Sequence, residues 1–224
     1  GIGHRLALGR LPDQTLADWR KNLDEALRLR PEHLSLYLLE IHEGTPLAEQ
    51  VRSRRQPQPD EDLAGEMYEM MLDKVAAEGY AQYEISNFSL PGFESRHNSK
   101  YWRCEPVYAF GVSAHSFDGA RRWSNERDTK AYVSLVEAGA SPVVEKIALD
   151  AVQLSAEFAF LSLRLANGLD LREYEKRFRR DLRAEFAAEL QRLEDLQLIE
   201  FDRHFLKLTR RGFVFSNEVF AVFV

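Results

Sequence analysis

The first half of the chain alternates between helical and strand-like hydrophobic patterns. Apolar residues at helical spacing follow a capping-box-like start at Thr15, and Pro31 ends this predicted helix. Residues 33–41 are almost continuously apolar, as in a strand buried on both faces of a parallel sheet. A second helix is predicted between Asp60, its N-cap, and Gly79, its C-cap. Since helix, short loop and buried strand form the repeating unit of α/β barrels and wound sheets, we expect an α/β fold.

The pattern changes near Asp150. Three amphipathic helices are expected after this residue, followed by a hairpin with strands at 198–201 and 205–208 and a last helix beginning at Thr209. Three helices and a hairpin are typical of a winged-helix-like domain. Ser141-Pro142 resembles a domain boundary, so we predict domains at residues 1–142 and 143–224.

The stretch from Gly79 to Trp102 contains the strongest candidate site. A strand-like run at 80–85, an Asn-Phe corner and a Pro-Gly turn precede a cluster of ring and hydrogen-bonding groups: Arg96, His97, Asn98, Tyr101 and Trp102. Such a cluster can bind a flat or anionic ligand, with His97 as a ligand or acid/base, Arg96 for a carboxylate and the two large rings as walls. The alternative is that the rings anchor a loop to the core and His97 hydrogen-bonds a carbonyl.

Two other segments carry candidate residues. The loop after the predicted buried strand contains Glu40, His42 and Glu43, which suit a metal site or an acid/base pair but equally a solvated loop. Small residues at 111–114 allow a close approach to the backbone, and His115 follows them as either a site residue or a packed histidine.

Composition excludes several classes. A net charge of −6 argues against a general nucleic-acid binder, and acidic neighbours dilute the C-terminal arginines 177, 179, 180 and 183, which favours protein packing or a lid over DNA binding. The single cysteine, Cys104, rules out an internal disulfide and a multi-cysteine metal site within this chain. Without a long apolar run or a signal peptide, the default expectation is a cytoplasmic protein. Gly1 in place of a starting Met suggests a fragment or a processed chain.

A series of motifs in one order resembles a known family, the radical S-adenosylmethionine haem chaperones of the HemW type and their relatives, the oxygen-independent coproporphyrinogen III oxidases. The motifs are Leu11-Pro12-x-Gln14-Thr15, residues 33–37, Glu43-Gly44-Thr45-Pro46, residues 83–88, His97-Asn98-x-x-Tyr101-Trp102 and residues 111–116. The resemblance covers nearly the whole chain from Leu11. It implies the second part of a partial (β/α) barrel followed by a small helical, winged-helix-like C-terminal domain.

The resemblance also implies roles for individual residues. The His-Asn-x-x-Tyr-Trp element is similar to the one linked to haem binding in the chaperone branch, which makes His97 the candidate ligand of haem iron, with Asn98, Tyr101, Trp102 and Arg96 beside it. Glu40 and His115 match positions that line the S-adenosylmethionine pocket in the oxidase branch.

The chain departs from the family in its first part. The Cys-x3-Cys-x2-Cys motif that binds the family's 4Fe-4S cluster is absent, and Cys104 matches none of those cysteines. The aspartate expected before Leu11-Pro12 is replaced by Leu6, or by Arg5 if Arg10 is an insertion. We therefore expect a C-terminal portion of the family protein that does not cleave S-adenosylmethionine alone.

Three functions remain open on the sequence. The leading one is part of a haem chaperone, binding haem or another porphyrin and passing it to haem-accepting respiratory proteins, with a membrane-associated partner and the missing N-terminal half of the barrel as further partners. The second is oxidative decarboxylation of coproporphyrinogen III, since Arg96, Arg121 and Arg122 suit propionates in either case. The third is a non-enzymatic winged-helix interaction module. No nucleic-acid partner is expected.

Overall fold

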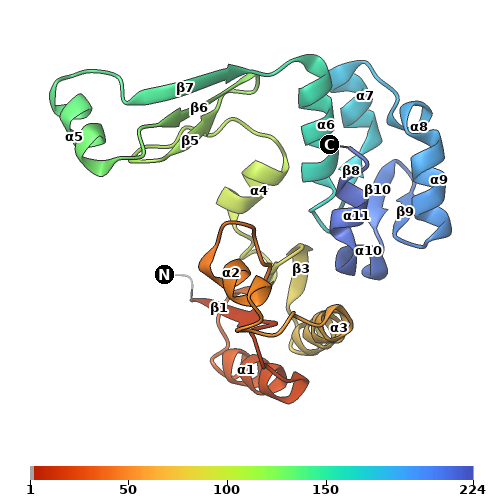
Figure 1. The fold of residues 1–224 in the computed structure, drawn as a ribbon. Helices are drawn as coiled ribbons and strands as arrows, with labels where there is room; N and C mark the ends of the chain where they lie inside the picture. Colours follow the sequence, from red (N-terminus) through yellow and green to blue (C-terminus); the bar gives the residue numbers. More distant parts are fainter. Residues whose placement is uncertain (1–2, 224) are drawn as a thin grey trace. The chain divides into compact units, whose positions relative to one another are not determined.

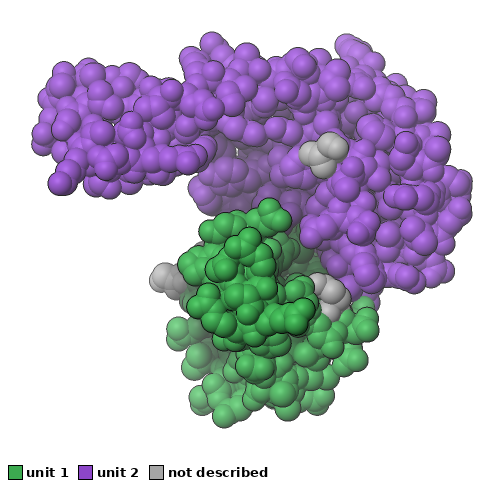
Figure 2. All heavy atoms as spheres, viewed as in Figure 1, with its two compact units in different colours: residues 1–94 green, residues 95–224 purple. Residues whose placement is uncertain are grey.

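The computed structural model describes residues 3–223 and divides into two compact units, residues 1–94 and residues 95–224 (Figure 2). Unit 1 contains β1 (His4–Gly9), α1 (Leu16–Arg28), β2 (His33–Leu38), α2 (Pro46–Arg52), α3 (Glu61–Ala77), β3 (Ala81–Glu84) and β4 (Asn87–Ser89). Its sheet has the order β1-β2-β4-β3. The strands β1 and β2 are parallel and joined through α1, as expected for a βαβ unit, whereas β3 and β4 are antiparallel to their neighbours.

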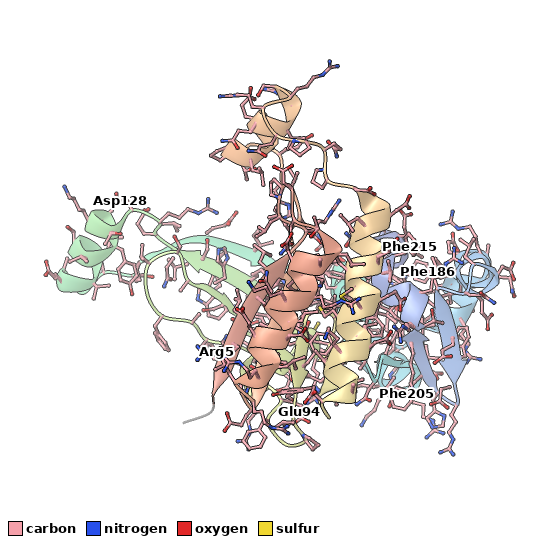
Figure 3. All side chains as sticks on the ribbon, turned by 90° about the horizontal axis from the view of Figure 1, so that it is seen from below. Arg5, Glu94, Asp128, Phe186, Phe205 and Phe215 are labelled. Carbon is pink, nitrogen blue, oxygen red and sulfur yellow. The ribbon has the colours of Figure 1, made fainter. Side chains whose placement is uncertain are left out.

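The helices α1 and α3 lie side by side against this sheet (Figure 3). The apolar positions that predicted them are buried, including Trp19, Leu23 and Leu27 on α1 and Met67, Met71 and Val75 on α3. The Trp19 indole N–H donates to the Met67 carbonyl at 3.0 Å, which ties the two helices together. The predicted caps are confirmed: Thr15 forms a capping box, Asp60 caps α3, and Gly79 follows α3 with a φ of +83°.

One local prediction in unit 1 was wrong. The Asn-Phe corner expected at residues 87 and 88 is the strand β4, because this segment pairs with β2 on one side and β3 on the other. The predicted strand at 33–41 ends earlier than expected, at Leu38.

Unit 2 begins with α4 (Arg96–Trp102) and an antiparallel sheet formed by β5 (His115–Phe117), β6 (Arg121–Asn125) and β7 (Val143–Ala148). The helix α5 (Thr129–Glu137) connects β6 to β7 at the end of this sheet that lies far from α6 (Figure 1). All six residues of β7 are exposed, which explains why the sequence shows no buried-strand pattern at these positions. The domain boundary predicted at residue 142 does not coincide with the division between the units, because β7 pairs with β6 and unit 2 already begins at Ser95.

The remainder of unit 2 is helical with a small sheet. It consists of α6 (Ala151–Ser162), β8 (Leu169–Asp170), α7 (Leu171–Phe178), α8 (Leu182–Glu185), α9 (Ala187–Asp195), β9 (Ile199–Asp202), β10 (Phe205–Leu208), α10 (Arg210–Val214) and α11 (Ser216–Phe220). The predicted hairpin is confirmed as β9 and β10, with β8 added to it in the order β8-β10-β9. The third predicted helix is two helices, since the chain leaves helical geometry at Phe186. Among residues 3–223, no helix is both long enough and apolar enough to cross a membrane.

Candidate functional site

The cluster at residues 96–102 forms the helix α4. Ser95 begins this helix by accepting a hydrogen bond from the Asn98 backbone N–H at 3.2 Å. Because His97 and Tyr101 are four residues apart, their rings meet on one side of the helix, edge to face, with centroids 5.0 Å apart. The sequence therefore placed these residues together correctly, although on a helix rather than in a loop. Both His97 and Arg96 are exposed.

A cavity of about 410 Å³ lies in unit 2 beside α4. Its walls come from α4, from the segment that follows it, from β5 and β6, and from α6. The lining residues are Tyr101, Trp102, Cys104, Glu105, Val107, His115, Ser116, Phe117, Arg122, Glu157, Phe160 and Leu161. Thus Tyr101, Trp102, His115 and Arg122 from the sequence-based candidates meet at one cavity, while His97 and Arg96 lie outside its lining.

The Trp102 side chain is held by an unusual set of contacts. The Arg164 guanidinium carbon lies 4.3 Å from the centre of the Trp102 ring and 5.7 Å from that of Phe220, so a cation packs against the indole face. The indole Nε1 is buried and has no hydrogen-bond partner among the described residues. A buried N–H without an acceptor is costly. The aromatic residues of the lining fit a flat ligand.

An ion pair contributes charge to the cavity lining. Arg122 on β6 donates from both terminal nitrogens to the two carboxylate oxygens of Glu157 on α6, at 3.1 and 2.8 Å. The same guanidinium lies 5.7 Å from the centre of the Phe117 ring. Its neighbour Arg121 pairs instead with Asp118, at 3.0 Å, in the turn between β5 and β6. Backbone N–H donors in that turn, from Ala120 and then Arg121 itself, hold the pKa of Asp118 below its ordinary value.

Cys104 also borders the cavity. It is buried, and desolvation raises the pKa of its thiol from 9.0 to about 12, only partly opposed by Arg177. An iron–sulfur cluster requires several thiolates, whereas the described residues form no group of three or more His, Cys, Asp or Glu placed to hold a metal. A 4Fe-4S cluster therefore does not fit the donors that this part of the chain provides.

The other sequence-based candidate loop lies in unit 1. Glu40 and His42 follow β2, both side chains are largely exposed, and the Glu40 Oε2 and His42 Nε2 atoms are 3.9 Å apart. This geometry agrees with a solvated loop, and an exposed carboxylate remains available to a cofactor.

A buried polar network in unit 1 was missed by the sequence analysis. Ser35 donates to Asn87, which donates to the buried carboxylate of Glu84. Nearby, His33 shares a hydrogen bond of 2.7 Å with the Tyr83 hydroxyl, and burial lowers the pKa of His33. The signal lay in the apolar run of β2, where polar side chains at 33 and 35 interrupt the hydrophobic pattern on one face.

Three of the four C-terminal arginines named above, Arg177, Arg180 and Arg183, are engaged within unit 2. Arg177 lies over the Phe158 ring at 5.0 Å and donates to the Cys104 carbonyl, Arg180 pairs with Glu185 at 2.7 Å, and Arg183 lies 4.1 Å from the centre of the Phe201 ring. These contacts support the packing role expected from the sequence over phosphate binding.

Comparison with known proteins shows which proteins this chain resembles. The family described as HemN C-terminal domain matches residues 149–215. The protein named Heme chaperone HemW from Bacillus subtilis is 33% identical over 214 residues, which is 96% of this chain and 56% of the relative. HemW from Lactococcus lactis is 30% identical over 217 residues, again with 96% and 56% covered. The chain thus spans about half the length of the curated relatives it matches.

Two further similarities agree with these matches. Radical S-adenosyl methionine domain-containing protein 1 from mouse mitochondria is 42% identical over 110 residues, 49% of this chain and 25% of the relative. The solved structure of coproporphyrinogen III oxidase (HemN) from Escherichia coli, a radical SAM enzyme, superimposes with a TM-score of 0.75 at 20% identity, covering 98% of this chain and 54% of that one. The fold predicted from the sequence is confirmed by this match. The chain is therefore similar over nearly its whole length to the proteins named HemW, and its residues 149–215 match the HemN C-terminal domain family.

Proposed function

We propose that this chain is the haem-binding part of a haem chaperone and that α4 carries the haem site. The observation that carries the proposal is the cavity beside α4, which Tyr101, Trp102, Phe117 and Phe160 line with aromatic surface. The relatives named Heme chaperone HemW supply the functional class. In its finer form, the proposal is that haem passes to respiratory haem proteins, some of them membrane-associated, from a cytoplasmic donor.

Each residue of α4 has a distinct part in this proposal. His97 offers an exposed imidazole nitrogen to iron, and histidine is the usual protein ligand of haem iron. Tyr101 and Trp102 offer aromatic surface to the macrocycle, and Arg96 offers an exposed guanidinium to a propionate. The Asn98 backbone N–H donates to the Ser95 side chain that caps the helix. The side-chain amide of Asn98 is proposed as a polar neighbour of the haem. Bound haem would supply the iron and the delocalised ring that the chaperone carries.

S-adenosylmethionine and the cluster belong to the remaining half of the family protein in this scheme. Glu40 in unit 1 offers an exposed carboxylate, and His115 in unit 2 lines the cavity; each is proposed by itself as a residue available to S-adenosylmethionine. We propose that the N-terminal half of the barrel is a partner of unit 1 and that this chain has no radical chemistry alone. The coproporphyrinogen oxidase alternative has only the shared fold behind it, because that structural neighbour is 20% identical.

The test is a haem titration followed by absorbance in the Soret region. Wild type is compared with His97→Ala, with the rival ligands His115→Ala and His42→Ala, and with His204→Ala as a matched control in the hairpin turn. We expect His97→Ala alone to shift the Soret band and weaken binding by about tenfold or more, because an iron ligand is lost. Thermal melts identify any variant whose fold is damaged.

Two results would contradict the proposal. Equal haem binding by wild type and His97→Ala would remove His97 as the ligand. Absence of saturable haem binding by the wild-type chain would remove the proposed function itself.

A further inference from the structure

We propose that Arg122 binds a carboxylate of the ligand in the cavity beside α4, and that Glu157 competes with that carboxylate for Arg122. The ion pair would then set the affinity of the cavity for porphyrin carboxylates. This inference rests on the proposed function, since it names the ligand group that enters the cavity and the residues that select it.

The shape and lining of the cavity carry the first step. A volume of about 410 Å³ lies in the lower part of the range of small-molecule sites, which suits one edge of a macrocycle rather than the whole ring. Tyr101, Trp102, Phe117 and Phe160 give the lining aromatic surface. An edge of a porphyrin that carries carboxylates would place flat, apolar surface against these rings and its anionic group against the polar part of the lining.

The cavity lining contains one arginine and two glutamates. Among the lining residues, Arg122 is the one arginine or lysine, while Glu105 and Glu157 carry carboxyl groups. A guanidinium binds carboxylates in a fork geometry, and the Glu157 carboxylate now occupies that fork through two hydrogen bonds. The Arg122 and Glu157 side chains are 41% and 21% exposed, so the pair is close enough to solvent to exchange partners.

Glu157 and the carboxylate of an incoming ligand compete for the guanidinium of Arg122. An incoming carboxylate meets an arginine that is already neutralised and a glutamate that repels it. Removing the Glu157 charge therefore frees Arg122 and abolishes the repulsion, which strengthens binding. Removing the Arg122 charge leaves two glutamates in the lining and weakens binding. The two substitutions break the same ion pair, so a purely structural role for the pair would move both variants in the same direction.

The experiment measures binding of iron-free protoporphyrin IX by absorbance and by quenching of tryptophan fluorescence. Omitting iron separates this contact from any axial ligand. We expect Arg122→Gln to weaken binding by about tenfold and Glu157→Gln to strengthen it by about threefold or more. Arg121→Gln is the matched control on the same strand, because Arg121 pairs with Asp118 in the turn. Glu137→Gln, at the exposed end of α5, controls for the loss of one negative charge.

A second ligand tests the chemical group. The dimethyl ester of protoporphyrin IX lacks free carboxylates, so all five proteins should bind it alike. S-adenosylmethionine also combines a flat aromatic ring with a carboxylate, and it is titrated against the same series. If S-adenosylmethionine and not the porphyrin shows the opposite shifts of the two variants, the assignment to porphyrin is overturned.

The remaining outcomes separate the inference from the proposed function. Equal porphyrin binding by all five proteins would overturn the role of Arg122 and leave haem binding at α4 standing. If the Arg122→Gln variant does not fold, Arg122→Lys replaces it, because lysine keeps the positive charge without the fork of the guanidinium. The inference would be overturned if Arg122→Lys binds porphyrin as tightly as wild type and Glu157→Gln leaves binding unchanged. Failure of wild type to bind either haem or protoporphyrin would remove both proposals.

Discussion

The thiol of Cys104 should be unreactive in the folded chain. Its reactivity decides whether the Cys104 sulfur can act as an iron ligand. Burial raises the pKa of the thiol from 9.0 to about 12. At pH 8 the thiolate fraction is then about 10⁻⁴, roughly 1,000-fold below that of a thiol with a pKa of 9. Since the thiolate is the reacting species, alkylation by iodoacetamide should slow by about the same factor relative to the unfolded chain.

The same shift predicts how stability depends on pH. The folded state holds the thiol proton more tightly than the unfolded chain, so the stabilising contribution is complete below pH 9 and is lost as the pH rises toward 12. Between pH 7 and pH 10 the unfolded thiol ionises, which should cost wild type about 1.4 kcal/mol more than Cys104→Ala. The tyrosines whose pKa is raised by burial, Tyr80 and Tyr174, are present in both proteins and cancel from the comparison.

The assays are mass spectrometry of alkylation in buffer and in 6 M urea, and urea unfolding of both proteins at pH 7 and pH 10. The reasoning is refuted if folded wild type is alkylated as fast at pH 8 as the urea-unfolded chain. It is also refuted if the two proteins lose the same free energy of unfolding between the two pH values. A silent thiol would exclude Cys104 as the ligand of haem iron in unit 2, which leaves histidine nitrogen and tyrosine oxygen as ligand types there.

Two further predictions concern stability and organisation. Gly212→Ala should lower the free energy of unfolding by about 1–3 kcal/mol, because a Cβ at Gly212 would lie 1.8 Å from the Leu198 carbonyl oxygen, and urea denaturation with an unchanged midpoint would contradict this close approach. Limited trypsin digestion should cut first near Arg52–Arg55, at the end of α2 and just after it, or between Ala138 and Lys146, where Lys146 on β7 is exposed. A first cut within Leu154–Leu165 would show that the boundary of the C-terminal unit expected from about Asp150 is misplaced.

The elements that the sequence predicted well are those whose signals are local. The caps at Thr15 and Asp60 and the apolar stripes that follow them lie within single helices, so α1 and α3 could be recognised without knowing their neighbours. The hairpin of β9 and β10 is local in the same sense. By contrast, β4 is a strand only because β2 and β3 lie on either side of it, and these partners are far from it in sequence or separated by a turn.

The candidate site was predictable only in part. The residues of α4 are consecutive, so their clustering was visible in the sequence. The cavity combines α4 with β5, β6 and α6, and its ion pair joins residues 35 positions apart, Arg122 and Glu157. The sequence singled out Arg122 as suited to propionates, but it did not single out Glu157, because a glutamate on a helix is an ordinary surface residue. Only the fold brings them to one cavity.

The geometry of α4 connects the two proposals. Residues on an α-helix follow one another at about 100°, so Tyr101 lies about 40° around the helix from His97, whereas Trp102 lies about 140° from it. Tyr101 therefore borders both the exposed side, where it contacts the His97 ring, and the cavity, which it lines. A macrocycle with its iron at His97 would reach the cavity with one edge, past Tyr101, and not with its full face. This arrangement assigns the iron-dependent part of the affinity to His97 and the carboxylate-dependent part to Arg122, and for that reason ferric haem and iron-free protoporphyrin report on different residues of the same site.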